Sequence, residues 1–215
     1  MAVLKLIVVG DLDGIRSALT VAQQSIQKTS GERLSQFEAK LTSLGADSAE
    51  RAKLEAQYLA SRSWYDGYLP RIVAGAFLTY TFAVVEEILR EFARNAQRDN
   101  QLALALRDIH GPPIDKALTY LQKAAGLNVS TLSGWPVLRE FQDLRNAVVH
   151  RAGRLGDNTK ERTSLKHLAT RFPKMLEVSD WTDGNAQLEF GPELVEQFAK
   201  EADALFEELL RMMYP

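Results

Sequence analysis

The segment "DGYLPRIVAGAFLTYTFAVVEEILREFARNAQ" (residues 66–97) predicts a long helix in the middle of the protein. Pro70 stands where the first turn of a helix accepts proline, because the missing N–H needs no partner there. Residues 72–85 are apolar on almost every side of the helix, which is typical of a helix buried between neighbours. Residues 86–98 are amphipathic and charged. We therefore expect a central, buried helix with a charged far end.

The residues before this helix show the same helical periodicity. Apolar residues recur at helical spacing through residues 12–44, with a weak point at Gly31, so this part forms either one long helix or two. A stop at Gly45 and an N-cap at Asp47 or Ser48 then start another helix. The two segments predict an antiparallel helical hairpin.

Turn residues divide the second half of the chain. "HGPP" (residues 110–113) breaks the chain before a helix from about residue 114 to residue 125, and Pro136 opens a further helix. "GRLGDNTKERT" (residues 153–163) predicts a polar connection. Two short β-prone runs, residues 174–180 and 185–190, flank an Asp-Gly turn signal and predict a small hairpin.

The last segment, from Gly191-Pro192 onward, is the clearest amphipathic helix of the chain. Its predicted apolar face comprises Leu194, Val195, Phe198, Ala202, Leu205, Phe206, Leu209 and Met213. The fold expected from these patterns is all-α. We predict a helical hairpin over residues 1–66 packed on a helical bundle over residues 67–215, with the β-hairpin before the last helix. The two parts are expected to form one folded unit.

Composition limits the chemistry that the chain can perform. With 215 residues, 46% of them hydrophobic, it can bury one sizeable core. It has no cysteine and three histidines, so disulfides and thiolate metal sites are impossible, and we expect neither a zinc centre nor another cofactor. The apolar run before Gly10 is four residues long, too short for a signal peptide or a membrane span. We expect a soluble cytoplasmic protein with no membrane partner.

Charge is distributed unevenly along the chain, although the net charge is only −2. Residues 136–174, the basic segment, carry 9 basic and 4 acidic groups. Residues 175–215, the acidic segment, carry 2 basic and 10 acidic groups. Either the two segments pair with each other in the fold, or the basic segment marks a surface that binds an anion.

The stretch "LRNAVVHRAG" (residues 144–153) lies at the centre of the basic segment, on the helix that Pro136 opens. One side of this helix carries a core stripe of Val137, Phe141, Leu144 and Val148. The opposite side carries Arg139, Asp143, Asn146 and His150. Arg145 falls between the two sides, beside Leu138 and Val149, with a side chain long enough to reach the polar side. These polar residues either face water or form a small site able to break a phosphodiester bond.

An arginine, usually followed by asparagine, and a histidine after four to six intervening residues form the R-X4-6-H motif of the HEPN superfamily. The stretch "RNAVVH" (residues 145–150) resembles this motif, and the helical context over residues 70–212 is similar to that of the family. The resemblance implies a helical bundle that forms a homodimer and acts as a metal-independent endoribonuclease, often as a toxin or antiviral effector. An RNA substrate and an antitoxin or regulatory protein are the partners that it implies.

The resemblance also implies residue roles. His150 would be the general acid or base, Arg145 would bind the scissile phosphate, and Asn146 would orient the histidine or the substrate. Asp143 could support the imidazole. The further candidates for binding RNA phosphates are Arg139, Arg151 and Arg154. A two-fold dimer would bring two copies of the motif together and so supply both an acid and a base.

A second interpretation is a non-catalytic HEPN bundle that binds a partner protein or a nucleotide. The modest net charge and the acidic segment favour it, because a ribonuclease usually presents a broad basic surface. One position departs from the pattern of HEPN toxins that pair with a nucleotidyltransferase. These toxins have a tyrosine two residues after the histidine, where this chain has Ala152.

Overall fold

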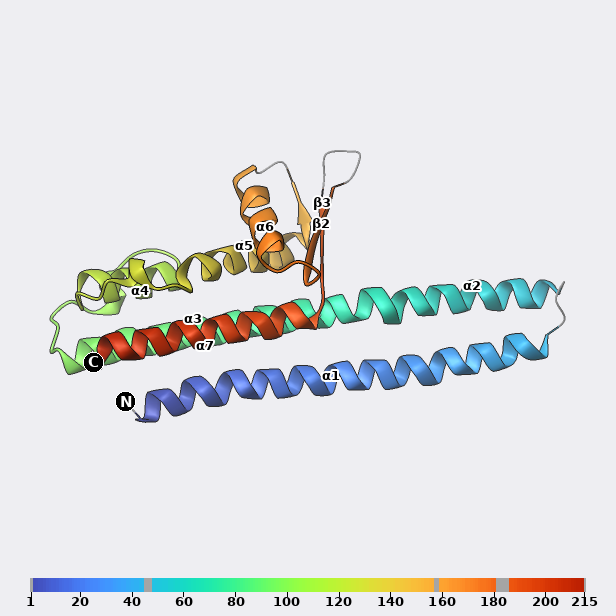
Figure 1. Cartoon of the computed structure of the whole chain (residues 1–215), viewed down its shortest axis with the longest axis horizontal. Coiled ribbons are helices and arrows are strands. Elements are labelled where there is room, and N and C mark those ends of the chain that lie inside the picture. Colours follow the sequence, from blue (N-terminus) through green and yellow to red (C-terminus); the bar gives the residue numbers. More distant parts are fainter. Residues whose placement is uncertain (1, 45–47, 157–158, 181–185, 215) are drawn as a thin grey trace.

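The computed structural model describes residues 2–44, 48–156, 159–180 and 186–214. Long helices lie side by side along one axis of the molecule, and shorter helices with a small sheet cover one side of them (Figure 1). Both termini lie at the same end of the long helices (Figure 1). The predicted all-α fold with a small β-hairpin is confirmed.

Two very long helical runs form the frame of the molecule. Helix α1 is one uninterrupted helix over Ala2–Ser43, which settles the choice between one helix and two. Helix α2 (Ala49–Ser63) begins at the predicted N-cap Ser48, whose hydroxyl accepts a hydrogen bond of 3.1 Å from the Arg51 N–H. A π-helical turn, η1 (Trp64–Tyr68), then joins α2 to the central helix α3 (Leu69–Asp99).

The first half of α1 belongs to the bundle core. Leu12, Ile15 and Leu19 are spaced for one face of a helix and are at most 5% exposed. Helix α2, by contrast, contains no buried residue. It projects from the body together with the second half of α1, and we name these two parts the arm (Figure 1). The predicted boundary near residue 66 falls inside η1, where the arm meets the body.

The remaining elements cover α3. They are η2 (Leu106–Asp108), α4 (Pro113–Lys123), η3 (Val129–Thr131), α5 (Trp135–Arg151), β1 (Arg154–Leu155), α6 (Thr159–Arg171), β2 (Leu176–Asp180), β3 (Ala186–Phe190) and α7 (Pro192–Met213). The sheet is antiparallel in the order β1-β3-β2, and Leu176 of β2 faces Phe190 of β3. The predicted β-hairpin is therefore confirmed, and its Asp183-Gly184 turn lies outside the described residues.

The predicted polar connection over residues 153–163 is wrong, because β1 and the start of α6 lie there. Only Leu165 and Leu168 of α6 are buried. Two apolar residues give too weak a periodic pattern for sequence reading to separate a helix from a loop. Packing against α5 is what stabilises such a polar helix.

Aromatic rings from different helices stack on one another in the core. Phe198 of α7 lies between Phe82 of α3 and Phe141 of α5, with centroid distances of 5.5 and 4.5 Å. Phe92 and Phe206 form a similar pair of α3 and α7 at 5.8 Å. The predicted apolar face of α7 is confirmed, with all its residues buried except Met213, which is partly buried.

One helical run, residues 49–99, is long and apolar enough to cross a membrane by length and composition alone. In its most apolar stretch, 44% of the residues are buried inside the protein. The central helix of a soluble protein has the same properties, so the structure is compatible with a soluble protein.

Candidate functional site

Helix α5 carries the predicted site and is held in the body by one apolar face. Its buried residues are Val137, Leu138, Phe141, Leu144 and Ala147. The side turned away from this face carries Asn146, which is half-buried, and Val149 and His150, which are exposed. Since His150 follows Asn146 by four residues, the two side chains lie one turn apart on the same ridge.

The C-terminal end of α5 is fixed by two residues with positive φ angles. Ala152 has φ 51° and Gly153 has φ 80°. The N–H groups of Ala152 and Gly153 donate to the carbonyls of Val148 and Ala147, both at 3.0 Å. The Gly153 carbonyl accepts a hydrogen bond of 2.9 Å from the Leu188 N–H. The turn thus closes α5 with a left-handed C-terminal cap, in which the Ala152 N–H makes the 5→1 hydrogen bond, and it ties the His150 end of the helix to β3.

We expect Gly153→Ala to lower the free energy of unfolding by about 1–2 kcal/mol, because an L-residue is strained in the left-handed region. A Cβ at Gly153 would also lie 3.1 Å from the Gln187 amide nitrogen. Ala152→Gly removes the same strain from the preceding residue and is expected to raise stability by about 0.5–1 kcal/mol. Urea unfolding of the two variants measures both effects, and equal signs for the two substitutions would contradict the prediction.

Arg145 turns its side chain toward Asn146. Its Nη1 donates a hydrogen bond of 3.1 Å to the Asn146 Oδ1. Its Nε is buried and has no hydrogen-bond partner among the described residues. A buried donor without a partner is costly, and because this N–H has no exposed surface, a phosphate would meet the other guanidinium N–H groups of Arg145. Arg145 therefore joins the side of α5 on which His150 lies.

Glu86 of α3 belongs to the same electrostatic environment. Burial raises the pKa of Glu86 above the ordinary value, and the positive charges of Arg145 and Arg90 oppose this rise. Glu86 is 59 positions before Arg145 and was not among the residues predicted for the site. The only feature of the sequence that indicated Glu86 was its position directly after the apolar residues 72–85.

The raised pKa of Glu86 predicts a pH dependence of stability. A carboxyl whose pKa is higher in the folded state gives its full contribution to stability below its unfolded pKa of about 4.3. That contribution is lost as the pH rises through the folded pKa. We therefore expect Glu86→Gln to raise the melting temperature more at about pH 7 than at about pH 4. The exposed Glu50→Gln variant is the control, and an equal gain at both pH values would refute the assignment.

His150 is exposed and makes no hydrogen bond or ion pair within the described part of the chain. The other two histidines lie elsewhere. His167 of α6 contacts Glu140, and His110 is an exposed residue before α4. No group of three or more potential metal ligands occurs among the described residues. One copy of the chain therefore brings a single histidine to the Arg145–Asn146 pair.

The other predicted site residues do not gather around His150. The Ser164 hydroxyl of α6 donates a hydrogen bond of 2.6 Å to Asp143, and no hydrogen bond links Asp143 to His150 in the described residues. Arg139 pairs with Asp115 of α4, and Arg151 pairs with Glu161 of α6. Arg154 of β1 is exposed, with no ion pair in the described segments.

Ion pairs compensate part of the charge of the basic segment. Within the segment, Arg151 pairs with Glu161, and Arg171 and His167 both contact Glu140. From the acidic segment, Asp180 alone pairs with it among the described residues, through Lys166 and Arg162. The hydrogen bond from Lys166 holds the pKa of Asp180 below its ordinary value. Two arginines thus pair within the basic segment, two cations pair with Asp180 of the acidic segment, and Arg139 pairs with Asp115 of α4, so pairing between the two segments accounts for part of the arrangement.

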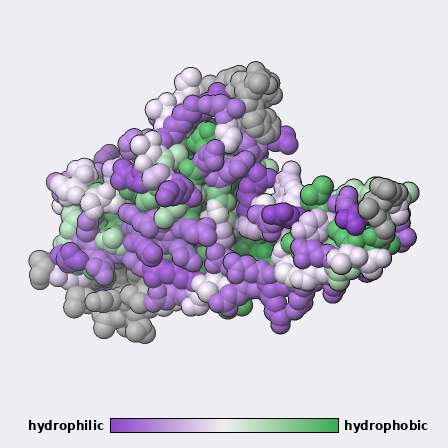
Figure 2. All heavy atoms as spheres, turned by 45° about the vertical axis from the view of Figure 1, so that its right-hand side comes forward, coloured by the Kyte–Doolittle hydropathy of each residue, from purple (hydrophilic) through white to green (hydrophobic). Residues whose placement is uncertain are grey.

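An exposed apolar patch lies beside the α5 ridge. It contains Tyr68 of η1 and Ile72, Ala76 and Tyr80 of α3, which follow one another at four-residue spacing, together with Val149 of α5. We name these five residues the α3 patch. Ile72, Tyr80 and Val149 are 54%, 61% and 44% exposed. A groove of about 360 Å³ runs between the two helices. Figure 2 shows apolar residues on the surface where the arm joins the body, in surroundings that are mostly polar.

Comparisons with protein-family models, with curated proteins and with solved structures find no match to this chain.

Proposed function

We propose that this protein is a metal-independent endoribonuclease of the HEPN type. The observation that carries the proposal is the Arg145–Asn146 hydrogen bond one turn from an exposed His150. A guanidinium with a free N–H can bind a phosphate, and an exposed imidazole can exchange a proton with the sugar or the leaving group. The motif therefore combines the two chemical groups that phosphodiester cleavage requires.

The reaction would use the RNA 2′-hydroxyl as the nucleophile. A base removes the 2′-hydroxyl proton, the 2′-oxygen attacks the adjacent phosphorus, and the bond from phosphorus to the 5′-oxygen breaks as an acid protonates that oxygen. The products are a 2′,3′-cyclic phosphate and a 5′-hydroxyl. Arg145 would stabilise the negative charge that develops on the phosphorane oxygens.

This chemistry needs two proton-transfer groups, and one copy supplies only His150. We propose that a homodimer completes the site, with His150 of one copy as base and His150 of the other as acid. The α3 patch supports this arrangement because it is contiguous with the α5 ridge and exposes large apolar side chains. Burial of the patch between two copies would bring the two motifs toward each other.

The dimer proposal predicts that charge in the α3 patch separates the copies. We expect the wild type to be a dimer in gel filtration with light scattering and the double variant Ile72→Glu/Tyr80→Glu to be a monomer, because burying two carboxylates in an apolar interface is unfavourable. Val21→Glu/Leu59→Glu is the matched control, since Val21 and Leu59 are 64% and 62% exposed on other helical surfaces. A monomeric wild type would exclude the composite site.

The activity itself is tested by incubating the wild-type protein with a mixed-sequence RNA in EDTA. The expected result is cleavage, with cyclic phosphate at the new 3′ ends. Products with a 3′-hydroxyl, or no cleavage of several different RNAs, would refute the proposed mechanism.

A second candidate function is a non-catalytic bundle that binds a protein or a nucleotide. It is favoured by the Arg139–Asp115 and Arg151–Glu161 ion pairs, which occupy two of the three arginines expected to bind RNA phosphates. Under this interpretation Arg145 and His150 would form a binding site rather than a catalytic one. RNA binding without cleavage in the EDTA assay would favour this function.

The resemblance to HEPN proteins extends the proposal to the setting of the protein. We propose a toxin or antiviral effector in the cytoplasm, controlled by an antitoxin or another regulatory protein. Because Ala152 stands where nucleotidyltransferase-regulated toxins have tyrosine, this control would not involve tyrosine modification at that position.

A further inference from the structure

A second cationic site lies away from α5. A cavity of about 700 Å³, open to solvent, is lined by the C-terminal half of α3, the η2 turn and the start of α4. Four of its nine lining residues are cations: Arg90, Arg94, Arg107 and Lys116. None of the nine is acidic. Its lining therefore favours an anion, and its volume is large enough for more than one phosphate group.

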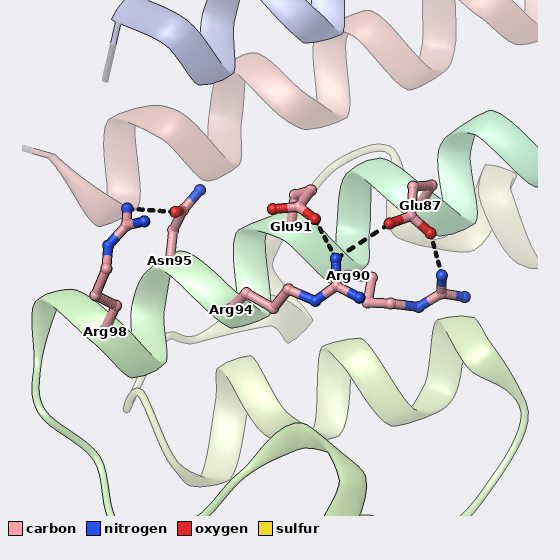
Figure 3. Close-up of polar contacts among 6 residues, drawn as sticks. All are labelled: Glu87, Arg90, Glu91, Arg94, Asn95 and Arg98. Carbon is pink, nitrogen blue, oxygen red and sulfur yellow. Dashed lines mark hydrogen bonds and ion pairs between the residues drawn. The ribbon is translucent and has the colours of Figure 1, made fainter.

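The cations come from three separate segments that the fold brings together. Arg90 and Arg94 extend from α3, where they pair with Glu87 and Glu91 on the same helix (Figure 3). These pairs are exposed to solvent, so each contributes little to stability and leaves several guanidinium N–H groups for a ligand.

The other two cations are less engaged in ion pairs. Lys116 of α4 has no ion pair within the described residues, and the side chain of Arg107 is 90% exposed. Arg107 lies 3.9 Å from its neighbour Asp108, at the limit of an ion pair. Their charges are thus available to the cavity.

The backbone adds to the attraction for anions. Pro113, the first residue of α4, lines the cavity, as does Gly111 with φ 130°. A Cβ on Gly111 would meet nothing within 4 Å, so the main chain there is open to a ligand. The N-terminus of a helix of 11 residues carries partial positive charge from N–H groups without intrahelical acceptors.

Electrostatic contacts connect this cavity with α5. Arg90 from the cavity and Arg145 from α5 both act on the Glu86 carboxylate. Asp115, which precedes Lys116, holds Arg139 of α5. Arg139 and His150 are separated by about 16 Å along the helix axis. Lys116 therefore lies near the Arg139 end of α5, on the same body as His150.

We propose that the α3–α4 cavity binds backbone phosphates of the RNA strand whose scissile phosphate lies at Arg145 and His150. This inference rests on the proposed ribonuclease function and deepens it, because it assigns the phosphate-binding surface to Arg90, Arg94, Arg107 and Lys116. Arg90 and Arg94 are paired with carboxylates, as Arg139 and Arg151 are, so the cavity differs through Arg107 and Lys116, which add two cations to a lining without acidic residues.

The test compares two pairs of substitutions in the full-length protein carrying His150→Ala, which prevents cleavage during the measurement. Arg107→Gln/Lys116→Gln removes two cavity cations. Arg62→Gln/Arg211→Gln removes the same charge from side chains that are 61% and 73% exposed elsewhere. Affinity for a fluorescein-labelled single-stranded RNA of about 12 nucleotides is measured by anisotropy over a range of salt concentrations. Inorganic tripolyphosphate provides a parallel ligand without nucleosides.

The cavity pair is expected to weaken RNA binding about tenfold and to reduce the slope of log affinity against log salt by about 1.4, since each lost phosphate contact changes it by about 0.7. The control pair should leave the slope unchanged. If the cavity pair and the control pair lose the same RNA affinity, the proposal is overturned, because the binding is then nonspecific charge attraction. Weaker tripolyphosphate binding with unchanged RNA binding would also overturn it, by assigning the cavity to a free polyphosphate.

A cleavage assay separates this inference from the proposed function. With His150 intact, the cavity pair should lose more of its cleavage of a long RNA at limiting concentration than of its cleavage of a dinucleotide, because a dinucleotide has one phosphate and cannot occupy both sites. Absence of cleavage in the wild type would refute the ribonuclease, whereas the anisotropy result would still decide the RNA-binding role of the cavity.

Discussion

His150→Ala is expected to reduce RNA cleavage by about 10²–10⁴-fold, the usual contribution of a general acid or base. The loss should appear in kcat, because proton transfer occurs in the transition state and not in substrate binding. His150 is exposed at the end of α5, so its removal creates no cavity and should leave the melting temperature unchanged. Single-turnover cleavage in EDTA measures the chemical step directly.

Two further variants define the roles within the motif. His110→Ala changes another exposed histidine and should keep full activity. Arg145→Lys retains the charge but loses the planar fork and the hydrogen-bonding geometry toward Asn146, so we expect a loss of about 10²-fold. Full activity of His150→Ala would refute the proposed site. Full activity of Arg145→Lys would show that a positive charge alone is sufficient at this position.

Phe141→Ala is expected to cause the largest loss of stability, about 3–5 kcal/mol. Phe141 is fully buried, and its ring stacks on Phe198 at 4.5 Å and contacts Phe172 at 5.8 Å. Alanine would leave a cavity where α5, α6 and α7 meet, and the surrounding rings cannot fill it without leaving their own contacts. Chemical unfolding followed by circular dichroism measures the change.

Phe37→Ala is the matched control for this substitution. Phe37 of α1 is only half-buried and contacts Tyr58 of α2 edge-on at 6.4 Å. Its removal should therefore cost clearly less than the removal of Phe141. Equal losses would mean that the arm contributes as much to global stability as the body.

Helical periodicity predicted most of the fold because it reflects contacts within one segment. The apolar face of α7 and the buried run of α3 are dense and regular, and both proved to be core. Helix α6 shows the limit of this signal, since Leu165 and Leu168 are its only buried residues. A helix that is stabilised mainly by one neighbour leaves little trace in its own sequence.

The motif on α5 could be predicted only as a set of residues on a helix. Arg145, Asn146 and His150 are close in sequence, so their proximity on the ridge follows from helical geometry. Asp143 and Arg139 occupy the same predicted face, but α6 and α4 engage them instead. A helical wheel gives angles around one axis and contains no information about which neighbour covers each angle.

The sequence by itself determined the helical class, the β-hairpin, the core faces of the helices and the local grouping of Arg145, Asn146 and His150. Only the tertiary structure decided that Arg139 and Arg151 are neutralised, that Glu86 lies in the field of Arg145, and that four distant cations line one cavity. The reason is physical: periodicity depends on residues a few positions apart, whereas ion pairs and cavities depend on which distant segments the packing of the core brings together.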